Sequence, residues 1–220
     1  MAEIEVSVVR YGVANLGSMI NMLRRIGATA RIVDEPAGVL GAERLILPGV
    51  GAFDAGMEAL HSRGLADPIR RRVSEGVPLL GVCLGMQMLG HGSAEGLGPG
   101  LGLLNARCVR FNFPAGERLR VPHMGWGRLN PKRDSQLLNG MPRESRFYFV
   151  HSYHLVCEDE TDVLASCVYG TEFTAMVQKG NIMGAQFHPE KSHKYGMALL
   201  KNFLQLDWRA RGPDGVAVRS

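Results

Sequence analysis

Val77-Pro78-Leu79-Leu80-Gly81-Val82-Cys83-Leu84-Gly85-Met86-Gln87 is an apolar run that ends in a cysteine bracketed by glycines. This pattern is typical of a buried strand, expected over residues 77–82, that turns sharply into a helix continuing to about Leu89. Glycine suits both sides of such a turn, because the backbone is strained and its neighbours leave no room for a Cβ. Cys83 would lie at the apex, in the first turn of the helix, which favours the reactive thiolate. The motif alone leaves a buried structural cysteine open as the alternative.

A cysteine nucleophile needs a base, and the base needs a group that orients it. Residues 182–187 have strand character and lead into His188-Pro189-Glu190. Pro189 disfavours the helical region for the residue before it, so His188 is expected to be extended. Residues two apart in an extended chain project to the same side, so Glu190 would reach the His188 ring. We therefore predict a Cys83–His188–Glu190 triad assembled from distant segments.

A third requirement is a pair of N–H groups for the negative oxygen that forms during attack. Residues 44–47 predict a short strand, which stops at Pro48-Gly49-Val50-Gly51. Glycines just past a strand end leave backbone N–H groups that can point into a cleft. We expect one donor from the Val50–Gly51 peptide and a second from the N–H of Leu84. An ordinary Pro-Gly turn is the alternative.

Together these residues resemble the class I, or triad-type, glutamine amidotransferases, in which the elbow and the His-Pro-Glu triplet are general features. Further segments resemble the glutaminase subunits of imidazole glycerol phosphate synthase (the HisH family), from histidine biosynthesis. These segments are residues 11–16, 121–126, 147–153 and 186–192. The resemblance runs from about residue 6 to residue 203, which is nearly the whole chain.

The resemblance implies that the protein hydrolyses glutamine to glutamate and ammonia, with no cofactor. Cys83 would attack the side-chain amide, His188 would protonate the departing ammonia, and water would hydrolyse the γ-glutamyl thioester. The family's glutamine contacts fall here on Gly49, Gln87, Glu95, His151, Ser152 and Tyr153. A carboxylate at Glu95 suits the α-ammonium of the substrate, and the amide of Gln87 suits hydrogen bonding.

The sequence shows no phosphate-binding loop and no second catalytic domain that could use the ammonia. The resemblance accordingly implies a partner that receives it. That partner is a separate (β/α)8 barrel cyclase or synthase subunit (HisF-like), held in a heterodimer. Interface candidates are Asn15, Met124, Trp126 and Lys191, with core packing as the alternative for Trp126. Arg10 stands where the family usually has an acidic residue, and Ala14 stands where it usually has glycine. Both departures lie in a turn that the family places near its partner.

Three alternatives stay open. Residues 15–18, 21–23, 54–57 and 191–197 look more like a paralogous branch, whose members supply ammonia for amidino-sugar formation in surface polysaccharide. Elbow-cysteine hydrolases and stress proteins share a similar α/β fold, but they lack a downstream His-x-Glu pair. The third alternative is a non-catalytic scaffold that only binds a partner, although Cys83, His188 and Glu190 are all intact.

Composition agrees with one globular domain, because 220 residues, 45% of them hydrophobic and 21% charged, can bury a full core. No apolar run approaches the roughly 20 residues that cross a bilayer. Residues 1–5 lack the basic start of a secretory signal, so we expect a cytoplasmic protein with no membrane partner. The net charge of +4 is a mild excess, and its arginines are not interleaved with stacking aromatics. We therefore expect no nucleic-acid partner.

The four cysteines show no paired metal-ligand spacing. His151, His154 and Cys157 fall three residues apart on one expected strand, where they would not share a face. We therefore expect no metal site.

Strand and helix patterns alternate along the first half of the chain. Expected strands cover residues 6–9, 29–33, 45–47 and 77–82, and expected helices cover 16–26, 53–61, 65–75 and 83–89. A glycine-rich loop at 90–102 would wrap the glutamine pocket. Shorter strands are expected around residues 109 and 121 and over 147–150, 163–168, 173–177 and 182–187, followed by a helix over 197–206.

This order predicts an α/β fold, a three-layer sandwich on a mainly parallel sheet with antiparallel additions. The active site should lie at the carboxyl ends of the parallel strands. We expect one amidotransferase domain over residues 1–206 and a flexible C-terminal tail over residues 207–220.

Overall fold

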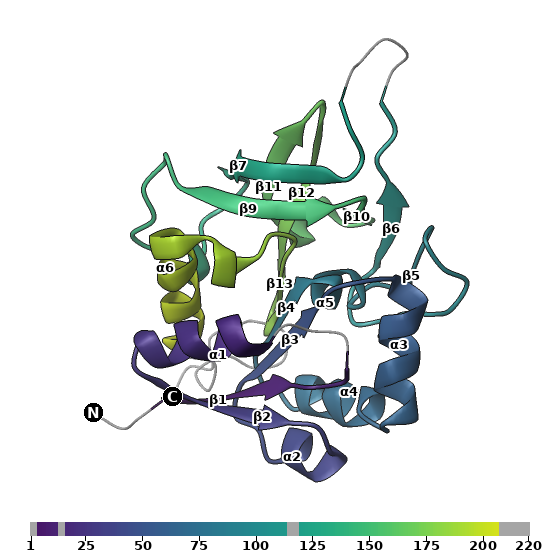
Figure 1. Cartoon of the computed structure of the whole chain (residues 1–220), viewed down its shortest axis with the longest axis vertical. Coiled ribbons are helices and arrows are strands. Elements are labelled where there is room, and N and C mark those ends of the chain that lie inside the picture. Colours follow the sequence, from purple (N-terminus) through teal and green to yellow (C-terminus); the bar gives the residue numbers. More distant parts are fainter. Residues whose placement is uncertain (1–3, 13–15, 114–118, 207–220) are drawn as a thin grey trace.

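An eight-stranded sheet forms the centre of the molecule in the computed structural model, which describes residues 4–12, 16–113 and 119–206 (Figure 1). Five neighbouring strands run parallel, in the order β2 (Ala28–Val33), β1 (Ile4–Val9), β3 (Leu45–Gly49), β4 (Leu79–Cys83) and β13 (Ile182–Ala185). The sheet continues with antiparallel strands β12 (Thr171–Lys179), β11 (Val163–Tyr169) and β8 (Asn130–Pro131). The expected tail at 207–220 and the interface candidate Asn15 lie outside the described residues.

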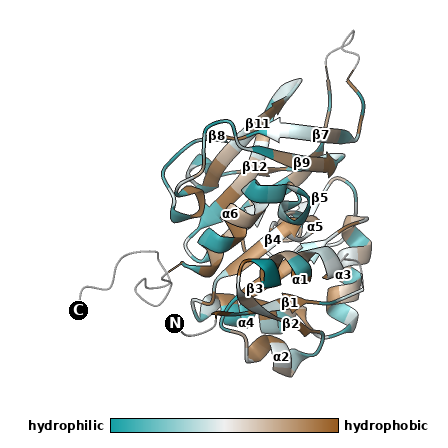
Figure 2. Cartoon of the chain, turned by 60° about the vertical axis from the view of Figure 1, so that its left-hand side comes forward, coloured by the Kyte–Doolittle hydropathy of each residue, from teal (hydrophilic) through white to brown (hydrophobic). Residues whose placement is uncertain are grey.

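Helices cover both faces of this sheet, because successive strand residues point to opposite sides. On β1, Val8 packs with α1 (Leu16–Arg25) and α6 (His193–Leu204), whereas Val9 packs with the helices of the other face. That second layer consists of α2 (Pro36–Leu40), α3 (Phe53–Ser62) and α4 (Ala66–Ser74). The central strands are accordingly hydrophobic along their length (Figure 2). The predicted three-layer α/β sandwich is confirmed.

Two small sheets stand over the carboxyl ends of the parallel strands. One joins β10 (Tyr153–Cys157), β6 (Ala106–Arg110) and β5 (Gly92–Ser93), and the other pairs β7 (His123–Arg128) with β9 (Arg146–His151). In Figure 1 the β7–β9 pair lies above the end of β4, where that strand runs into α5 (Leu84–Gln87). An isolated bridge between Tyr148 and His188 ties this pair to the end of the main sheet. Within the described residues there are also three short 3₁₀ turns: η1 (Gln136–Leu138), η2 (Glu160–Asp162) and η3 (Pro189–Lys191).

Several element boundaries differ from the sequence prediction. The helix expected to reach about Leu89 is the single turn α5, because the N–H of His91 bonds to the carbonyl of Ala106 and draws the chain toward β6. The strand expected around Val121 begins at His123, since Pro122 has no N–H to donate to a ladder. α6 begins at His193 rather than at residue 197, and the five-residue α2 was not predicted.

Candidate active site

The backbone of Cys83 has the strained geometry that the glycine-bracketed motif predicts. Its φ is 54° and its ψ is −112°, a conformation that costs energy for a residue with a Cβ. A Cβ on Gly85 would lie 1.7 Å from the carbonyl oxygen of Leu47, so only glycine fits there. The strand therefore ends in a sharp turn that presents the sulfur beyond the sheet, as expected for a nucleophile elbow.

His188 and Glu190 are hydrogen-bonded to each other, as predicted. Nδ1 of the histidine lies 2.7 Å from Oε1 of the glutamate, and His188 has the expected extended backbone with φ −98° and ψ 98°. The predicted route to this contact is wrong, because Glu190 does not continue the extended chain. It lies in the 3₁₀ turn η3, which bends the carboxylate back beneath the ring. A carboxylate acceptor places the neutral-ring proton on Nδ1 and leaves Nε2 for chemistry.

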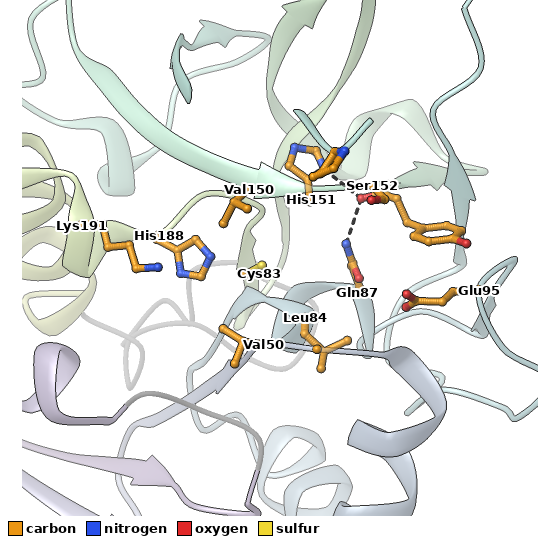
Figure 3. Close-up of a pocket in the computed structure, with 13 residues that line it drawn as sticks. Val50, Cys83, Leu84, Gln87, Glu95, Val150, His151, Ser152, His188 and Lys191 are labelled. Carbon is orange, nitrogen blue, oxygen red and sulfur yellow. Dashed lines mark hydrogen bonds between the residues drawn. The ribbon is translucent and has the colours of Figure 1, made fainter. Parts of the chain in front are cut away.

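The charge of His188 is set by its two partners. Burial disfavours the charged ring, but the interactions with Cys83 and Glu190 outweigh burial and raise the pKa of His188 to about 9. Nε2 is buried and has no hydrogen-bond partner within the described part of the chain. The ring points toward Cys83 (Figure 3). At neutral pH this arrangement favours an imidazolium next to the nucleophilic sulfur.

A cavity of about 300 Å³ opens in front of Cys83, which is large enough for a small amino-acid substrate. It is lined by Val50, Gly51, Cys83, Leu84, Gln87, Glu95, Pro122, Val150, His151, Ser152, Tyr153, His188 and Lys191. The structure thus gathers most of the predicted site residues around one space, although they come from five separate segments (Figure 3). Gly49 and Glu190 instead border a small adjoining space behind the triad.

Gly49 and Gly51 have different reasons to be glycine. A Cβ on Gly49 would lie 2.3 Å from the hydroxyl oxygen of Tyr11, which donates a 2.7 Å hydrogen bond to the carbonyl of Pro48. Gly51 has φ 102°, which other residues rarely adopt. Residues 48–51 therefore form an ordered segment at the mouth of the cavity, where the predicted Val50–Gly51 donor would lie.

The amide of Gln87 is held by the protein itself. Its Nε2 donates to the carbonyl of Tyr153 at 2.9 Å and to Oε1 of Gln186 at 3.0 Å. Both amide hydrogens are therefore used within the described structure, so a glutamine contact from this side chain would have to come from its oxygen.

Glu95 also has a structural partner. Its Oε2 accepts a 2.9 Å hydrogen bond from the backbone N–H of Phe53, at the start of α3, where a negative charge is favourable. The same junction is closed from the other side by Asp54, whose two oxygens accept from the N–H groups of Leu97 and Gly98 at 2.9 and 3.1 Å. Glu95 thus reaches the cavity as part of a loop that is clamped to α3.

Two buried histidines meet at the cavity wall, where His151 lines the cavity and His123 contacts it from another strand. Nδ1 of His151 is 2.8 Å from the carbonyl of Tyr153 and must carry the proton, so Nε2 accepts from Nδ1–H of His123 at 3.3 Å. Burial lowers the pKa of His151 to about 3 and that of His123 to about 4. Both rings are therefore neutral in the folded protein, and the wall that carries residues 151–153 is uncharged.

The interface candidates on β7 are exposed. Met124 is 63% and Trp126 is 48% exposed, so core packing does not account for Trp126. Its ring stacks on His193 with centroids 5.6 Å apart, and Lys191 lies over the neighbouring ring of Tyr148. The exposed face of β7, with Met124 and Trp126, thus continues through His193 and Tyr148 to Lys191, which lines the cavity.

Arg10, the charge departure near the first turn, is paired inside the chain. Its guanidinium forms an ion pair with Asp34, at the carboxyl end of β2, and the Nε–Oδ2 distance is 3.1 Å. This hydrogen bond holds the pKa of Asp34 below its usual value. The reversed charge is therefore matched by an acidic neighbour on the same surface.

Sequence reasoning missed Gln186 as a site residue, and it did not predict that Pro122 and Val150 line the cavity. Gln186 is fully buried, and its Nε2 lies 3.8 Å from Sγ of Cys83. The available signal was its position just after the last strand before His188, whereas the pairing of that strand with the one that carries Cys83 appears only in the structure.

The metal argument rested on a wrong strand assignment. His151 ends β9, whereas His154 and Cys157 belong to β10, so the three do not lie on one strand. In the described ranges, no group of three His, Cys, Asp or Glu side chains is placed to hold a metal ion. Nor does any described helix have the length and apolar character needed to cross a membrane.

Comparisons with known proteins agree with this geometry. Residues 8–206 match the family model "Glutamine amidotransferase class-I". A Pseudomonas aeruginosa protein named "Imidazole glycerol phosphate synthase subunit HisH 2" is 51% identical, covering 90% of this chain and 98% of the relative. A Methanococcus maripaludis protein of the same name is 45% identical, with 91% and 98% coverage. A Salinibacter ruber protein named "Imidazole glycerol phosphate synthase subunit HisH" is also 45% identical, with 91% and 94% coverage.

Solved structures share the fold. A crystal structure of a glutamine amidotransferase is 24% identical with a TM-score of 0.67, covering 90% of this chain and 97% of the other. A glutamine amidotransferase from Thermotoga maritima is 16% identical with a TM-score of 0.66, covering 93% and 98%. At such identities the likeness concerns the fold alone.

Proposed function

This chain belongs to the class-I glutamine amidotransferase family, and we propose that it is the glutaminase subunit of an imidazole glycerol phosphate synthase. It hydrolyses glutamine to glutamate and ammonia. One observation carries the proposal: Cys83 and His188 line one amino-acid-sized cavity, and Glu190 is hydrogen-bonded to His188 from behind. They do so in a chain that is 41–51% identical to proteins named as subunits of that synthase.

The geometry supports a two-step reaction through a thioester. The thiolate of Cys83 attacks the side-chain carbonyl carbon of glutamine, and the N–H groups of Val50, Gly51 and Leu84 are our candidates to stabilise the oxygen that becomes negative. The C–N bond breaks as the His188 imidazolium gives its proton to the leaving nitrogen, which departs as ammonia. Neutral His188 then takes a proton from water, whose oxygen attacks the thioester carbon. The C–S bond breaks, and glutamate leaves with the thiolate and imidazolium restored.

The roles of the pocket residues are part of the same proposal. Glu95 binds the α-ammonium of glutamine with the carboxylate oxygen that does not cap α3, and Gln87 contributes its amide oxygen. Backbone groups of His151, Ser152 and Tyr153 complete the pocket, and Gly49 contributes from the small space that adjoins it. The cavity size and the clamped loop support this assignment.

A direct test is glutamate release from glutamine by the purified protein, with Cys83→Ala as the inactive control. A glutamine-analogue label should attach to Cys83 in the wild type and not in the variant. Glutamate release that persists in Cys83→Ala would contradict the triad assignment.

The ammonia is passed to a partner, which we propose is a (β/α)8 barrel cyclase subunit (HisF-like) in a cytoplasmic heterodimer. Support comes from the names of the relatives and from the exposed Met124 and Trp126 beside the cavity. Glutamate release should rise strongly when the histidine-pathway cyclase subunit and its nucleotide substrate are added. If Cys83 accepts the label but no stimulation occurs, another synthase is the partner.

The alternatives are less well supported. The relatives at 41–51% identity carry the name of the histidine-pathway synthase, so the surface-polysaccharide branch is not favoured. An elbow-cysteine hydrolase of another family is excluded by the family match over residues 8–206. A non-catalytic scaffold would not need the charged His188 that the site maintains next to Cys83.

A further inference from the structure

Gln186 and Cys83 occupy equivalent positions at the ends of two neighbouring parallel strands. In the β13–β4 pairing, Ala185 lies opposite Val82, so the next residue on each strand is Gln186 and Cys83. Side chains at paired positions of parallel strands project to the same side of the sheet. The strand register therefore places the amide of Gln186 next to the sulfur, at 3.8 Å from Nε2 to Sγ.

A chain of hydrogen bonds fixes which end of the Gln186 amide faces the sulfur. The carbonyl of Tyr153 can only accept, so the Gln87 nitrogen must point toward it, and the same nitrogen donates to Oε1 of Gln186. If the Gln186 amide were turned over, two NH₂ groups would face each other. The NH₂ group of Gln186 is thus directed at Cys83, and the dashed line from Gln87 in Figure 3 marks the start of this chain.

Cys83 needs such a donor more than the sequence suggested. Only 7% of the Cys83 residue is exposed, so protein groups rather than water supply most of the contacts of its sulfur. The helix that follows it is the four-residue turn α5, which has little dipole to offer. The His188 imidazolium is one group that can stabilise a negative sulfur, and the amide N–H of Gln186, which points at the sulfur, is a second.

We propose that Gln186 is a positioning residue that acts through Cys83: its amide N–H stabilises and orients the thiolate, and Gln87 keeps that amide the right way round. The proposal deepens the glutaminase assignment, because it names a group that prepares the nucleophile without touching glutamine. It concerns the resting site and does not depend on which synthase uses the ammonia.

The test is the pH profile of Cys83 alkylation by iodoacetamide, read by mass spectrometry of the peptide that carries Cys83. Wild type, Gln186→Leu, Gln186→Glu and Gln87→Leu are compared from about pH 5 to about pH 10. Gln178→Leu is the matched control, because Gln178 is buried in β12 and bonds to Ser135 away from the site. Thermal unfolding of each variant shows whether it is folded.

We expect Gln186→Leu to move the midpoint of the profile up by about one pH unit and to slow alkylation near neutral pH about tenfold. Gln186→Glu keeps the side-chain size but brings a carboxylate to the sulfur, so its shift should be larger. Gln87→Leu should give a smaller shift, because the Gln186 amide is then free to turn. Gln178→Leu should match the wild type. In the glutaminase assay, Gln186→Leu should lower kcat about tenfold and leave KM within about twofold.

A wild-type alkylation profile in folded Gln186→Leu would overturn the proposal, as would a rise in KM at unchanged kcat. If Gln186→Leu does not fold, the alkylation profile of Gln186→Glu is the test. An unshifted profile in that variant would also overturn the proposal. The alkylation measurement uses neither glutamine nor a partner. A protein that shows the predicted shifts yet releases no glutamate, either alone or with the cyclase subunit and its nucleotide substrate, would contradict the proposed function and support this inference.

Discussion

At the scale of single residues, the proposed chemistry depends on keeping a proton on His188. Its pKa of about 9 lies above the usual value of about 6.5, because Cys83 and Glu190 favour the charged ring despite burial. The imidazolium therefore predominates at neutral pH and is lost as the pH rises through about 9. The same interaction stabilises the fold fully below about pH 6.5, and that contribution disappears between about pH 6.5 and 9.

We predict that kcat/KM for glutamine falls above about pH 9 and that Glu190→Gln moves this fall to lower pH. Removing the carboxylate removes one of the two groups that raise the pKa of His188. Glu158→Gln, a change at an exposed surface carboxylate bonded to Asn105, is the control. The measurement is kcat/KM against pH for the three proteins. An unchanged alkaline limit in Glu190→Gln would show that another group controls it.

The turn at Cys83 predicts a sharp difference between two glycines. In Gly85→Ala the new Cβ would meet the Leu47 carbonyl at 1.7 Å, so we expect a loss of about 3 kcal/mol or more in the free energy of unfolding. Gly41→Ala is the control, since its Cβ would lie at an ordinary 3.5 Å from the nearest atom. Denaturant unfolding of both variants measures the difference. Equal stability of the two would contradict the steric argument.

The residues of the proposed triad could be picked out from sequence because Cys83 ends a strand bracketed by glycines and His188 precedes a proline, although the 3₁₀ turn that brings Glu190 to the ring was not predicted. The contacts of Gln186 and Glu95 were not predictable in the same way. Gln186 meets Cys83 only because β13 and β4 are neighbours, although the residues are 103 positions apart. Glu95 caps α3 only because a loop folds back over that helix. Local patterns do not encode which distant strands or loops become neighbours.

At the scale of elements, the junction between α3 and the loop before residue 99 is held by two carboxylates. Glu95 bonds to the start of α3, and Asp54 of α3 bonds to the N–H groups of Leu97 and Gly98. We predict that Asp54→Ala raises the KM for glutamine about fivefold with little change in kcat, because Glu95 loses its fixed position while the triad is untouched. Steady-state kinetics at several glutamine concentrations measures both constants.

Asp67→Ala is the matched control for this change. Asp67 also lies in the first turn of a helix, α4, but it pairs with Arg70 at the surface. If Asp54→Ala and Asp67→Ala have the same KM, the clamp does not position the substrate site.

The element pattern itself was predicted well wherever apolar periodicity was strong. The parallel strands and the helices α1, α3 and α4 agree with expectation to within a few residues. The errors concern elements that are short, or whose ends depend on contacts with distant parts of the chain. α2 has only five residues, too few for a periodic signal, and α5 ends early because the chain is drawn into a neighbouring sheet.

At the scale of the whole molecule, the two neutral histidines at the cavity wall, His123 and His151, should make the fold sensitive to acid. Burial holds the pKa of His123 at about 4 and that of His151 at about 3. The unfolded chain therefore binds protons that the folded chain does not between about pH 6.5 and those values, so stability falls as the pH drops. Each histidine contributes a slope of up to about 1.4 kcal/mol per pH unit.

We predict that the stability of His123→Phe falls less steeply between about pH 6 and 4 than that of the wild type. The difference in slope should correspond to about one proton fewer taken up on unfolding. Phenylalanine suits this position because the ring stacks between Phe149 and Tyr169. His91→Phe, at an exposed histidine, is the control. Denaturant unfolding at several pH values gives the slopes. Equal slopes for His123→Phe and the wild type would mean that His123 does not take part in acid unfolding.

The proposed partner face follows from the alternation along β7. His123 points inward and contacts His151 at the cavity wall, whereas Met124 and Trp126 are exposed. A partner seated on the outer side would therefore press on the strand whose inner side supports the cavity wall. Large exposed aromatic side chains often dominate the binding energy of an interface.

We predict that Trp126→Ala raises the partner concentration needed for half-maximal stimulation about tenfold or more and leaves the partner-free glutaminase rate unchanged. Ile32→Ala is the control, because Ile32 is 45% exposed on β2. β2 is an edge strand of the main sheet, and β11, which β7 contacts, lies beside the opposite edge strand. Glutamate release is measured while the cyclase subunit is titrated in the presence of its nucleotide substrate. An unchanged titration would place the partner elsewhere. An unchanged midpoint with a lower plateau would instead assign Trp126 to the transmission of stimulation rather than to binding.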